Sequence, residues 1–488
     1  MRINIENNKE NTESSSNKKS GNILKDLFLV ISTNLLSLLS GVVTSLIIPK
    51  YLGVSEYGSL MIFTFYVTYV SVLQFGYNDG IYIRFGNYDY DELPREKFRM
   101  YFWFLLASQI FLSIVLFIIF KFTVKDPVRM NIFMLICFNV VFSNVFFFFN
   151  LINQITRRFK LYSLSLVVTK LFYVISSFLF ILLGIRNHIY FMVSLTLINL
   201  LVLIINILNS KEIIFGIKER IRDNLRDLAE NALVGIPQLI GNFMVTLIVG
   251  TSRLFIDKFF TLKDFAVYSF AVSLLSIVYL FIGAISTVVY PYLARTSKEN
   301  LHILYTRMKF VVLILISLSL SSYFLLNIFV KIVLPKYSAS LEISLLLFTT
   351  ILFRSQVDVV SRNFYKVMKL QKEYTINNVV AFIISFIAAF IAFITLKSTI
   401  GMAISAAITF FIWMIYTDYY FIRKLGLNLI KMHLCEILIV GVFLASGFLL
   451  NWYMGFSLYL LGLLAIIFAF YRSDIINLIK QKADYFKV

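Results

Sequence analysis

Three charged side chains stand at helical spacing inside one apolar stretch of the chain. Arg354, Asp358 and Arg362 are spaced i, i+4 and i+8, so in a helix they share one face. In a membrane span an Arg costs about 3 kcal/mol on insertion scales, so it usually faces a cavity or an ionic partner. One carboxylate does not neutralise two guanidinium groups. We therefore predict an anion site with planar, bidentate donors on this face. The alternative is a buried salt-bridge ladder between helices. For Arg362 a further alternative is that its long side chain reaches the membrane interface.

Other charged residues lie inside or beside apolar segments. Lys170 is a second candidate for an anion-binding cleft, or a long side chain that reaches the membrane interface. Arg253 and Asp257 are spaced i, i+4 near the expected outer end of another segment. They are predicted either to close an outer gate or to form a plain interfacial salt bridge.

The run from Phe75 to Gly86 combines glycines with Asp79 and Arg84 and continues an apolar segment toward the cytoplasm. One interpretation is that it caps the inner mouth of a cleft. The other is structural, because Asp-Gly is an ordinary turn signal.

Metal and catalytic motifs are not found. The two cysteines, Cys137 and Cys435, are predicted to be packing residues, and the three histidines lie far apart in sequence. No metal site or nucleophile motif is expected, and the chain is not expected to be an enzyme.

Long apolar segments must position these residues. Of 488 residues, 59% are hydrophobic and only 15% charged, against roughly a quarter charged in soluble domains. Since a bilayer core of about 30 Å needs roughly 20 helical residues, the chain is predicted to be an all-α polytopic membrane protein with about 14 spans. The predicted spans are 28–48, 58–76, 101–120, 128–150, 162–184, 188–208, 232–252, 265–290, 309–333, 341–365, 375–396, 400–422, 433–451 and 456–471.

The basic residues set the orientation. With the N-terminus in the cytoplasm, the inner loops and tails hold about three times as many Lys and Arg as the outer loops. Both termini are thus predicted to be cytoplasmic, and residues 1–27 to be a disordered tail rather than a signal peptide. Much of the net charge of +19 is then a topology signal, and nucleic acid is not expected as a partner.

An internal repeat divides the spans. The segment 48–58 recurs in residue type at 256–266, and 157–162 recurs at 369–374, both at an offset of about 210 residues. Six spans separate the copies, so a parallel repeat of two six-helix lobes around a central cleft is predicted. The expected parts are a tail (1–27), an N-lobe (28–208), an amphipathic, surface-lying basic linker (209–231), a C-lobe (232–422), two further helices (423–471) and a cytoplasmic tail (472–488).

A family resemblance rests on residues 24–100. Their motifs resemble bacterial polysaccharide flippases of the Wzx or O-antigen transporter type, and the rest of the chain resembles the wider superfamily of multidrug exporters in helix number and repeat. The motifs are Asn34-Leu35, Ser40-Gly41, Pro49-Lys50-Tyr51-Leu52-Gly53, Glu56-Tyr57-Gly58 and Phe75-Gly76 with Asp79-Gly80.

This resemblance implies a MATE-like flippase in the bacterial cytoplasmic membrane. Its cargo would be an undecaprenyl-pyrophosphate-linked oligosaccharide for O-antigen, capsule or exopolysaccharide, moved by alternating access beside membrane lipids. A polysaccharide polymerase and a chain-length regulator are the expected partners. No cofactor is expected, and Asp358 or Asp79 is a candidate for coupling the cycle to protons or sodium.

Two other functions are weighed. A membrane polymerase or ligase needs a sizeable outer loop, and all outer connections here are short. A cation-coupled drug exporter needs unpaired carboxylates in its cleft. The sequence instead indicates two Arg and one Lys against one clear Asp, which favours an anionic cargo.

Overall fold

The computed structural model describes residues 36, 37, 39–294 and 300–485, and all regular elements in that part are helical. Twelve helices there are long and apolar enough to cross a membrane, and the bent pair Val54–Gln74 and Tyr77–Arg84 makes a thirteenth if it is one span. The beginning of the first predicted span, 28–35, and residue 38 lie outside the described residues. The predicted all-α multi-pass class is confirmed.

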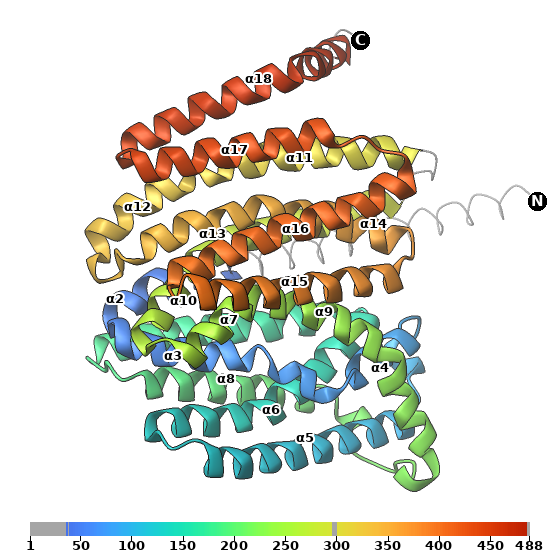
Figure 1. Cartoon of the computed structure of the whole chain (residues 1–488). Helices are drawn as coiled ribbons and strands as arrows, with labels where there is room; N and C mark the ends of the chain where they lie inside the picture. Colours follow the sequence, from blue (N-terminus) through green and yellow to red (C-terminus); the bar gives the residue numbers. More distant parts are fainter. Residues whose placement is uncertain (1–35, 38, 295–299, 486–488) are drawn as a thin grey trace, which may run out of the picture. The chain divides into compact units, whose positions relative to one another are not determined.

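The chain divides into two compact units (Figure 1). The first unit comprises residues up to Ile48 and Ile62–Leu239, and the second comprises Pro49–Met61 and Ile240–Val488. Helix α9, Leu225–Phe259, contributes to both. The first unit otherwise contains part of α3 (Val54–Val67), η2 (Val70–Gln74), α4 (Tyr77–Arg84), α5 (Arg95–Thr123), α6 (Pro127–Ile155), α7 (Phe159–Leu182) and α8 (His188–Leu208).

The second unit is built around one buried helix. This helix runs as α13 (Ser340–Ser355), a π-helical turn η8 (Gln356–Ser361) and α14 (Arg362–Val367), and 89% of its most apolar window is buried. The surrounding helices are α10 (Leu262–Ala294), α11 (Leu301–Leu320), α12 (Ser322–Val333), α15 (Gln371–Thr395), α16 (Thr399–Leu425), α17 (Ile430–Leu449) and α18 (Trp452–Tyr485). Helices α17 and α18 lie side by side along α11 and α12 (Figure 1).

Local sequence sets several helix ends. Asp126 caps α6 by accepting from the backbone N–H of Val128 and Arg129, with Pro127 in the first turn. Ser398 caps α16 through the N–H of Gly401, and Gly426 ends that helix in the left-handed conformation. These signals fix where the apolar segments begin and end.

A sharp bend of 59° separates η2 from α4. It occurs at Phe75 and Gly76, which have φ values of 51° and 78°. Asp79 and Gly80, whose types are also a turn signal, lie inside α4 just beyond this bend. Glycine is favoured at the bend because a side chain is strained at positive φ.

The internal repeat has matching backbone geometry. Arg157 between α6 and α7 has a φ of 57°, and Lys369 between α14 and α15 has a φ of 56°. In both copies the N–H of the preceding residue donates to the carbonyls two and four positions earlier. Thr156 donates to Gln154 and Ile152, and Met368 donates to Lys366 and Phe364. Non-glycine residues rarely adopt positive φ. The shared conformation therefore supports the predicted duplication.

The basic linker differs from the expected surface-lying segment. Its residues Ile213 and Ile214 are buried in the core of the first unit. The Trp103 indole N–H donates to the Ile214 carbonyl at 3.0 Å, and Arg95 on α5 pairs with Glu212 at 2.8 Å. Since α9 begins at Leu225, the linker is also shorter than predicted. Ile213 and Ile214 pack the first part of the linker on α5, whereas Phe215, Ile217 and Ile221 are exposed, so only this first part departs from the expected surface-lying segment.

Candidate functional site

The predicted anion-binding residues lie on the buried helix of the second unit. Arg354 is in the last turn of α13, Asp358 is in the π-helical turn, and Arg362 begins α14. A π-helical turn uses i→i+5 hydrogen bonds and is frequent at functional sites, because it redirects the side chains that follow. The three residues thus surround the one irregular turn of this helix.

Arg354 is held by a carboxylate and by an aromatic ring. Its Nε donates to Asp358 Oδ2 at 2.9 Å, and its side chain is 20% exposed. The guanidinium carbon also lies 4.3 Å from the ring centroid of Tyr279 on α10. The Tyr279 hydroxyl is 3.1 Å from Thr350 Oγ1, which fixes the ring. Asp358 and Tyr279 thus hold the Arg354 guanidinium from two sides.

Arg362 differs from Arg354 in its surroundings. Its side chain is half-buried, and its Nε is buried with no hydrogen-bond partner among the described residues. Asp358 is engaged by Arg354, so it does not neutralise both cations. The helix carries an excess of positive charge at its π-helical turn.

A side chain from α10 and one from α14 hold the same turn in place. Ser286 Oγ donates to the Asp358 carbonyl at 3.1 Å, and Asn363 Nδ2 donates to Ser286 Oγ at 3.2 Å and to the Val359 carbonyl at 2.8 Å. A widened turn otherwise leaves backbone groups without partners. These bonds hold the irregular turn, and with it the cationic side chains, in place.

The other predicted cations and gating residues lie elsewhere. Lys170 is exposed on α7 of the first unit, whereas Arg354 and Arg362 belong to the second, so a common cleft stays a prediction. Arg253 and Asp257 lie on α9; Asp257 is buried, and Arg253 interacts electrostatically with Tyr57 and Tyr268. Their role as a gate also stays a prediction.

Asp79 belongs to a buried polar network in the first unit. Gln74 Nε2 donates to Asp79 Oδ2 at 2.6 Å, and the Asn78 backbone N–H donates to Gln74 Oε1 at 2.6 Å. Asn144 on α6 donates to Gln109 Oε1 at 2.8 Å and to the Val70 carbonyl at 2.9 Å. These bonds satisfy polar groups around the bend between η2 and α4, so Asp79 stabilises the broken helix.

Arg84 joins α4 to α9. Its Nη2 lies 2.7 Å from Asp227 Oδ1, and its Nη1 lies 2.5 Å from Asn231 Oδ1. Lys97 on α5 approaches the same carboxylate at 3.1 Å, and the Tyr101 hydroxyl donates to it. Sequence spacing did not indicate this cluster, because Asp227 is separated from its partners by more than a hundred positions. Asp227 joins α9 to both α4 and α5.

Replacing Asp227 with asparagine is expected to lower the free energy of unfolding by about 2 kcal/mol, since charge-assisted hydrogen bonds contribute roughly 1.5–3 kcal/mol. A lower melting temperature in detergent measures this. Asp223→Asn, an exposed carboxylate in the linker, is the control and is expected to melt like the wild type. Equal melting temperatures for both variants contradict the role assigned to Asp227.

Three buried charges were missed in the sequence. Lys309 on α11, Asp418 on α16 and Glu436 on α17 are all 0% exposed. The Lys309 ammonium donates to Asp418 Oδ2, and the Tyr305 hydroxyl donates to Asp418 Oδ1 at 2.8 Å. The predicted balance of two Arg and one Lys against one Asp is therefore wrong. The excess of cations is local to the π-helical turn.

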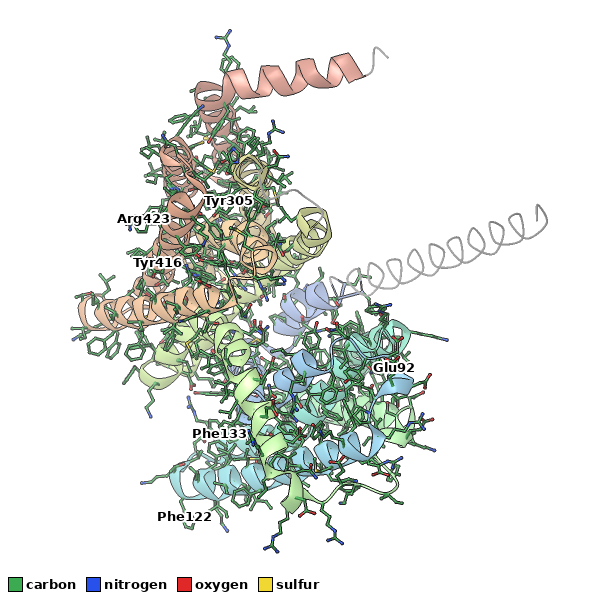
Figure 2. All side chains as sticks on the ribbon, turned by 90° about the vertical axis from the view of Figure 1, so that its right-hand side faces the viewer. Glu92, Phe122, Phe133, Tyr305, Tyr416 and Arg423 are labelled. Atoms are coloured by element: carbon green, nitrogen blue, oxygen red, sulfur yellow. The ribbon has the colours of Figure 1, made fainter. Side chains whose placement is uncertain are left out.

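A pocket of about 440 Å³ lies at the end of the same unit that is predicted to be cytoplasmic. Tyr365 and Tyr420 stack with ring centroids 5.5 Å apart, and the Arg423 guanidinium lies 4.5 Å from the Tyr419 ring centroid. Figure 2 shows Tyr416 and Arg423 along one edge of this unit. In the sequence, the run from Tyr416 to Lys424 is the signal for this pocket, although its basic residues by themselves indicate only topology. The lining residues are Tyr365, Glu373, Ile376, Asn377, Tyr416, Tyr419, Tyr420, Arg423 and Lys424.

Comparisons with known proteins agree with this architecture. Residues 23–297 match the family model described as "Polysaccharide biosynthesis protein". The structure is similar to the inward-closed lipid II flippase MurJ, with a TM-score of 0.67, 16% identity, and coverage of 93% of this chain and 100% of that one. It is also similar to the MATE multidrug transporter DinF-BH, with a TM-score of 0.53, 16% identity, and coverage of 82% of this chain and 97% of that one. A search of curated proteins found no match.

Proposed function

The chain belongs to the polysaccharide biosynthesis protein family, and we propose that it flips an undecaprenyl-pyrophosphate-linked oligosaccharide across the bacterial cytoplasmic membrane. It is a multi-pass membrane protein whose family and fold are those of transporters, not of catalytic enzymes. This family and fold disfavour the polymerase or ligase alternative. The product would serve O-antigen, capsule or exopolysaccharide synthesis, with a polymerase and a chain-length regulator as partners.

The observation that carries this proposal is the local excess of positive charge at the π-helical turn. Two guanidinium groups, Arg354 and Arg362, lie there with one carboxylate, Asp358, in the most buried helix of the unit. An arginine fork binds phosphate oxygens in a bidentate manner and keeps its charge in a poorly hydrated site. A pyrophosphate is an anion of matching sign and geometry.

The tyrosine-lined pocket supports a sugar as the other part of the cargo. Aromatic faces pack against the apolar faces of sugar rings, while amide, carboxylate and basic groups bind hydroxyl and acidic substituents. Tyr365, Tyr420, Asn377 and Arg423 supply both kinds of group. In this proposal the pocket receives the oligosaccharide and the π-helical turn receives the pyrophosphate.

The remaining steps of the cycle follow the predicted topology. With both termini in the cytoplasm, alternating access would expose the site to each side in turn. The polyprenyl chain would stay in lipid beside α17 and α18, whose outer faces carry exposed apolar residues such as Leu434, Leu461 and Phe468. Asp358 and Asp79 stay the candidates for coupling to protons or sodium.

A drug exporter of the same fold is the second candidate, favoured by the similarity to DinF-BH. A cation-binding exporter requires carboxylates that are free to bind its cargo. Asp418 pairs with Lys309, and Asp358 pairs with Arg354. Glu436 is buried and lies 3.1 Å from His433, so it is not exposed to a cargo. The charges at the π-helical turn therefore favour an anionic cargo.

Deletion in the native host is expected to cause complete lipid-linked repeat units to accumulate on the cytoplasmic leaflet. Extraction of lipid-linked glycans, with and without prior treatment of intact spheroplasts by a membrane-impermeant glycosidase, measures both amount and leaflet. The wild-type gene in trans is the control. Unchanged glycans together with altered drug tolerance would favour the exporter.

A further inference from the structure

A second group of buried charges lies in the second unit, between α11, α16 and α17. The His433 Nδ1 is 3.1 Å from Glu436 Oε2, and the His433 Nε2 is 3.6 Å from Asp418 Oδ2. Asp418 also accepts hydrogen bonds from Lys309 and Tyr305. The histidine therefore lies between two carboxylates that are both 0% exposed.

One of these carboxylates is only partly satisfied. Glu436 Oε1 is buried and has no hydrogen-bond partner among the described residues. An ionised carboxylate with a bare oxygen is costly in a buried site, whereas a carboxylic acid leaves a smaller charge unsolvated. Glu436 is thus the member of the group whose charge is least supported.

The charges of the group balance only when one proton is added. Lys309 contributes one positive charge and Asp418 one negative charge, so that pair is neutral. With His433 neutral, an ionised Glu436 leaves one uncompensated negative charge. One proton on either His433 or Glu436 restores neutrality, and a second proton leaves an excess positive charge.

This count covers the four groups that lie in direct contact, and other titratable groups lie on the packed helices. On α17 itself, the Lys431 ammonium lies 4.5 Å from the ring centroid of Tyr471 on α18 and acts electrostatically on Cys435, next to Glu436. On α13, Arg354 pairs with Asp358 and Glu342 is exposed. Further groups among the described side chains are His302 and Arg307 on α11, Tyr323 and Lys331 on α12, Tyr416, Tyr419, Tyr420, Arg423 and Lys424 on α16, and Tyr453, Tyr459 and Arg472 on α18.

A metal ion does not fit the group. Within the described residues, no set of three or more His, Cys, Asp and Glu side chains has an arrangement able to hold a metal. The Lys309 ammonium already occupies the Asp418 carboxylate as its cation. The remaining ligand that matches the missing charge is a proton.

We propose that His433 and Glu436 form a buried site for a single proton, shared between the imidazole Nδ1 and the carboxylate Oε2. The proton enters and leaves through His433, whose side chain is 16% exposed, while Glu436 is closed to solvent. Since His433 also faces Asp418, its protonation changes the contact between α17 and α16. This site goes beyond the proposed function, because its ligand is the same whatever the cargo.

Infrared difference spectroscopy on the purified full chain in lipid nanodiscs tests the proposal. Spectra at alkaline and acidic pH are subtracted, and the C=O stretch of a buried carboxylic acid and the imidazole bands are followed. The wild type is expected to show a buried-carboxyl or imidazole signal that follows one proton per molecule. Glu436→Gln is expected to lose the carboxyl part of the signal and one bound proton. Glu342→Gln, which removes an exposed carboxylate of the same unit, is expected to leave it unchanged.

Two outcomes overturn the proposal. The first is a Glu436→Gln spectrum and proton count equal to those of the wild type. Where Glu436→Gln does not yield folded protein, His433→Gln is measured instead. The second outcome is a His433→Gln titration curve equal to that of the wild type. Neither outcome bears on glycan export, so failure here is distinguishable from failure of the proposed cargo.

Discussion

Replacing Arg354 or Arg362 with glutamine is expected to abolish glycan export in a complementation assay. Each change removes guanidinium donors from the π-helical turn, and each charge-assisted hydrogen bond to a phosphate contributes about 1.5–3 kcal/mol. The loss of one such bond weakens binding roughly ten- to a hundredfold. Surface polysaccharide measured in the deletion strain carrying each variant reports the effect.

The two arginines separate binding from folding. Arg362 Nε has no partner among the described residues, so Arg362→Gln is expected to keep the wild-type melting temperature while it abolishes export. Asp358→Asn removes the partner of Arg354 but keeps both cations, and is expected to retain cargo binding. A loss of export by this variant with normal folding would assign Asp358 to ion coupling. Lys336→Gln, an exposed cation outside this helix, is the control. The opposite result is that Arg354→Gln and Asp358→Asn lose folded protein equally while Arg362→Gln exports normally. It would show that the Arg354–Asp358 ion pair is purely structural.

Replacing Gly80 with alanine is expected to disrupt the first unit. A Cβ atom at Gly80 would overlap the Asn231 carbonyl oxygen, and one at Gly235 would overlap the Gly76 carbonyl oxygen. Helices α4 and α9 therefore pack backbone to backbone, as small residues allow. An added methyl group forces them apart and also breaks the bonds of Arg84 to α9. We expect a loss of about 3 kcal/mol or more.

The melting temperature and the yield of monodisperse protein measure this effect. Gly441→Ala is the matched control, because a Cβ there meets nothing within 4 Å and alanine is the better helix former. A Gly80→Ala protein that melts with the wild type would contradict the close packing of α4 on α9. Gly80→Ser tests the same point with a second small side chain.

Sequence patterns predicted the spans well, because span length and hydropathy are local properties. The repeat was visible too, and its second match carries the same positive φ at Arg157 and Lys369. The bend at Phe75 and Gly76 could not be placed from the sequence, since Asp79-Gly80 is an equally good turn signal in isolation. The close contact of Gly80 with α9 joins residues far apart in the sequence, so it required the structure.

The candidate site was predicted in part for the same reason. Arg354 and Asp358 are near in sequence, so their pairing was accessible from spacing alone. Lys309 and Asp418 pair across more than a hundred residues, and neither interrupts the hydropathy of its own helix. The π-helical turn between Arg354 and Arg362 has no sequence signature that we recognised. Long-range ion pairs and helix irregularities could therefore be identified only from the structure.

We propose that this chain moves an anionic lipid-linked oligosaccharide across a membrane. Reconstitution of the purified protein in liposomes that carry such a lipid in both leaflets, with a membrane-impermeant glycosidase added outside, tests this directly. Wild-type protein is expected to make the inner-leaflet pool accessible to the enzyme. Arg362→Gln is expected to leave that pool protected, as in protein-free liposomes. Equal protection with wild-type protein and with none, in liposomes containing correctly folded protein, would show that the chain does not move this lipid.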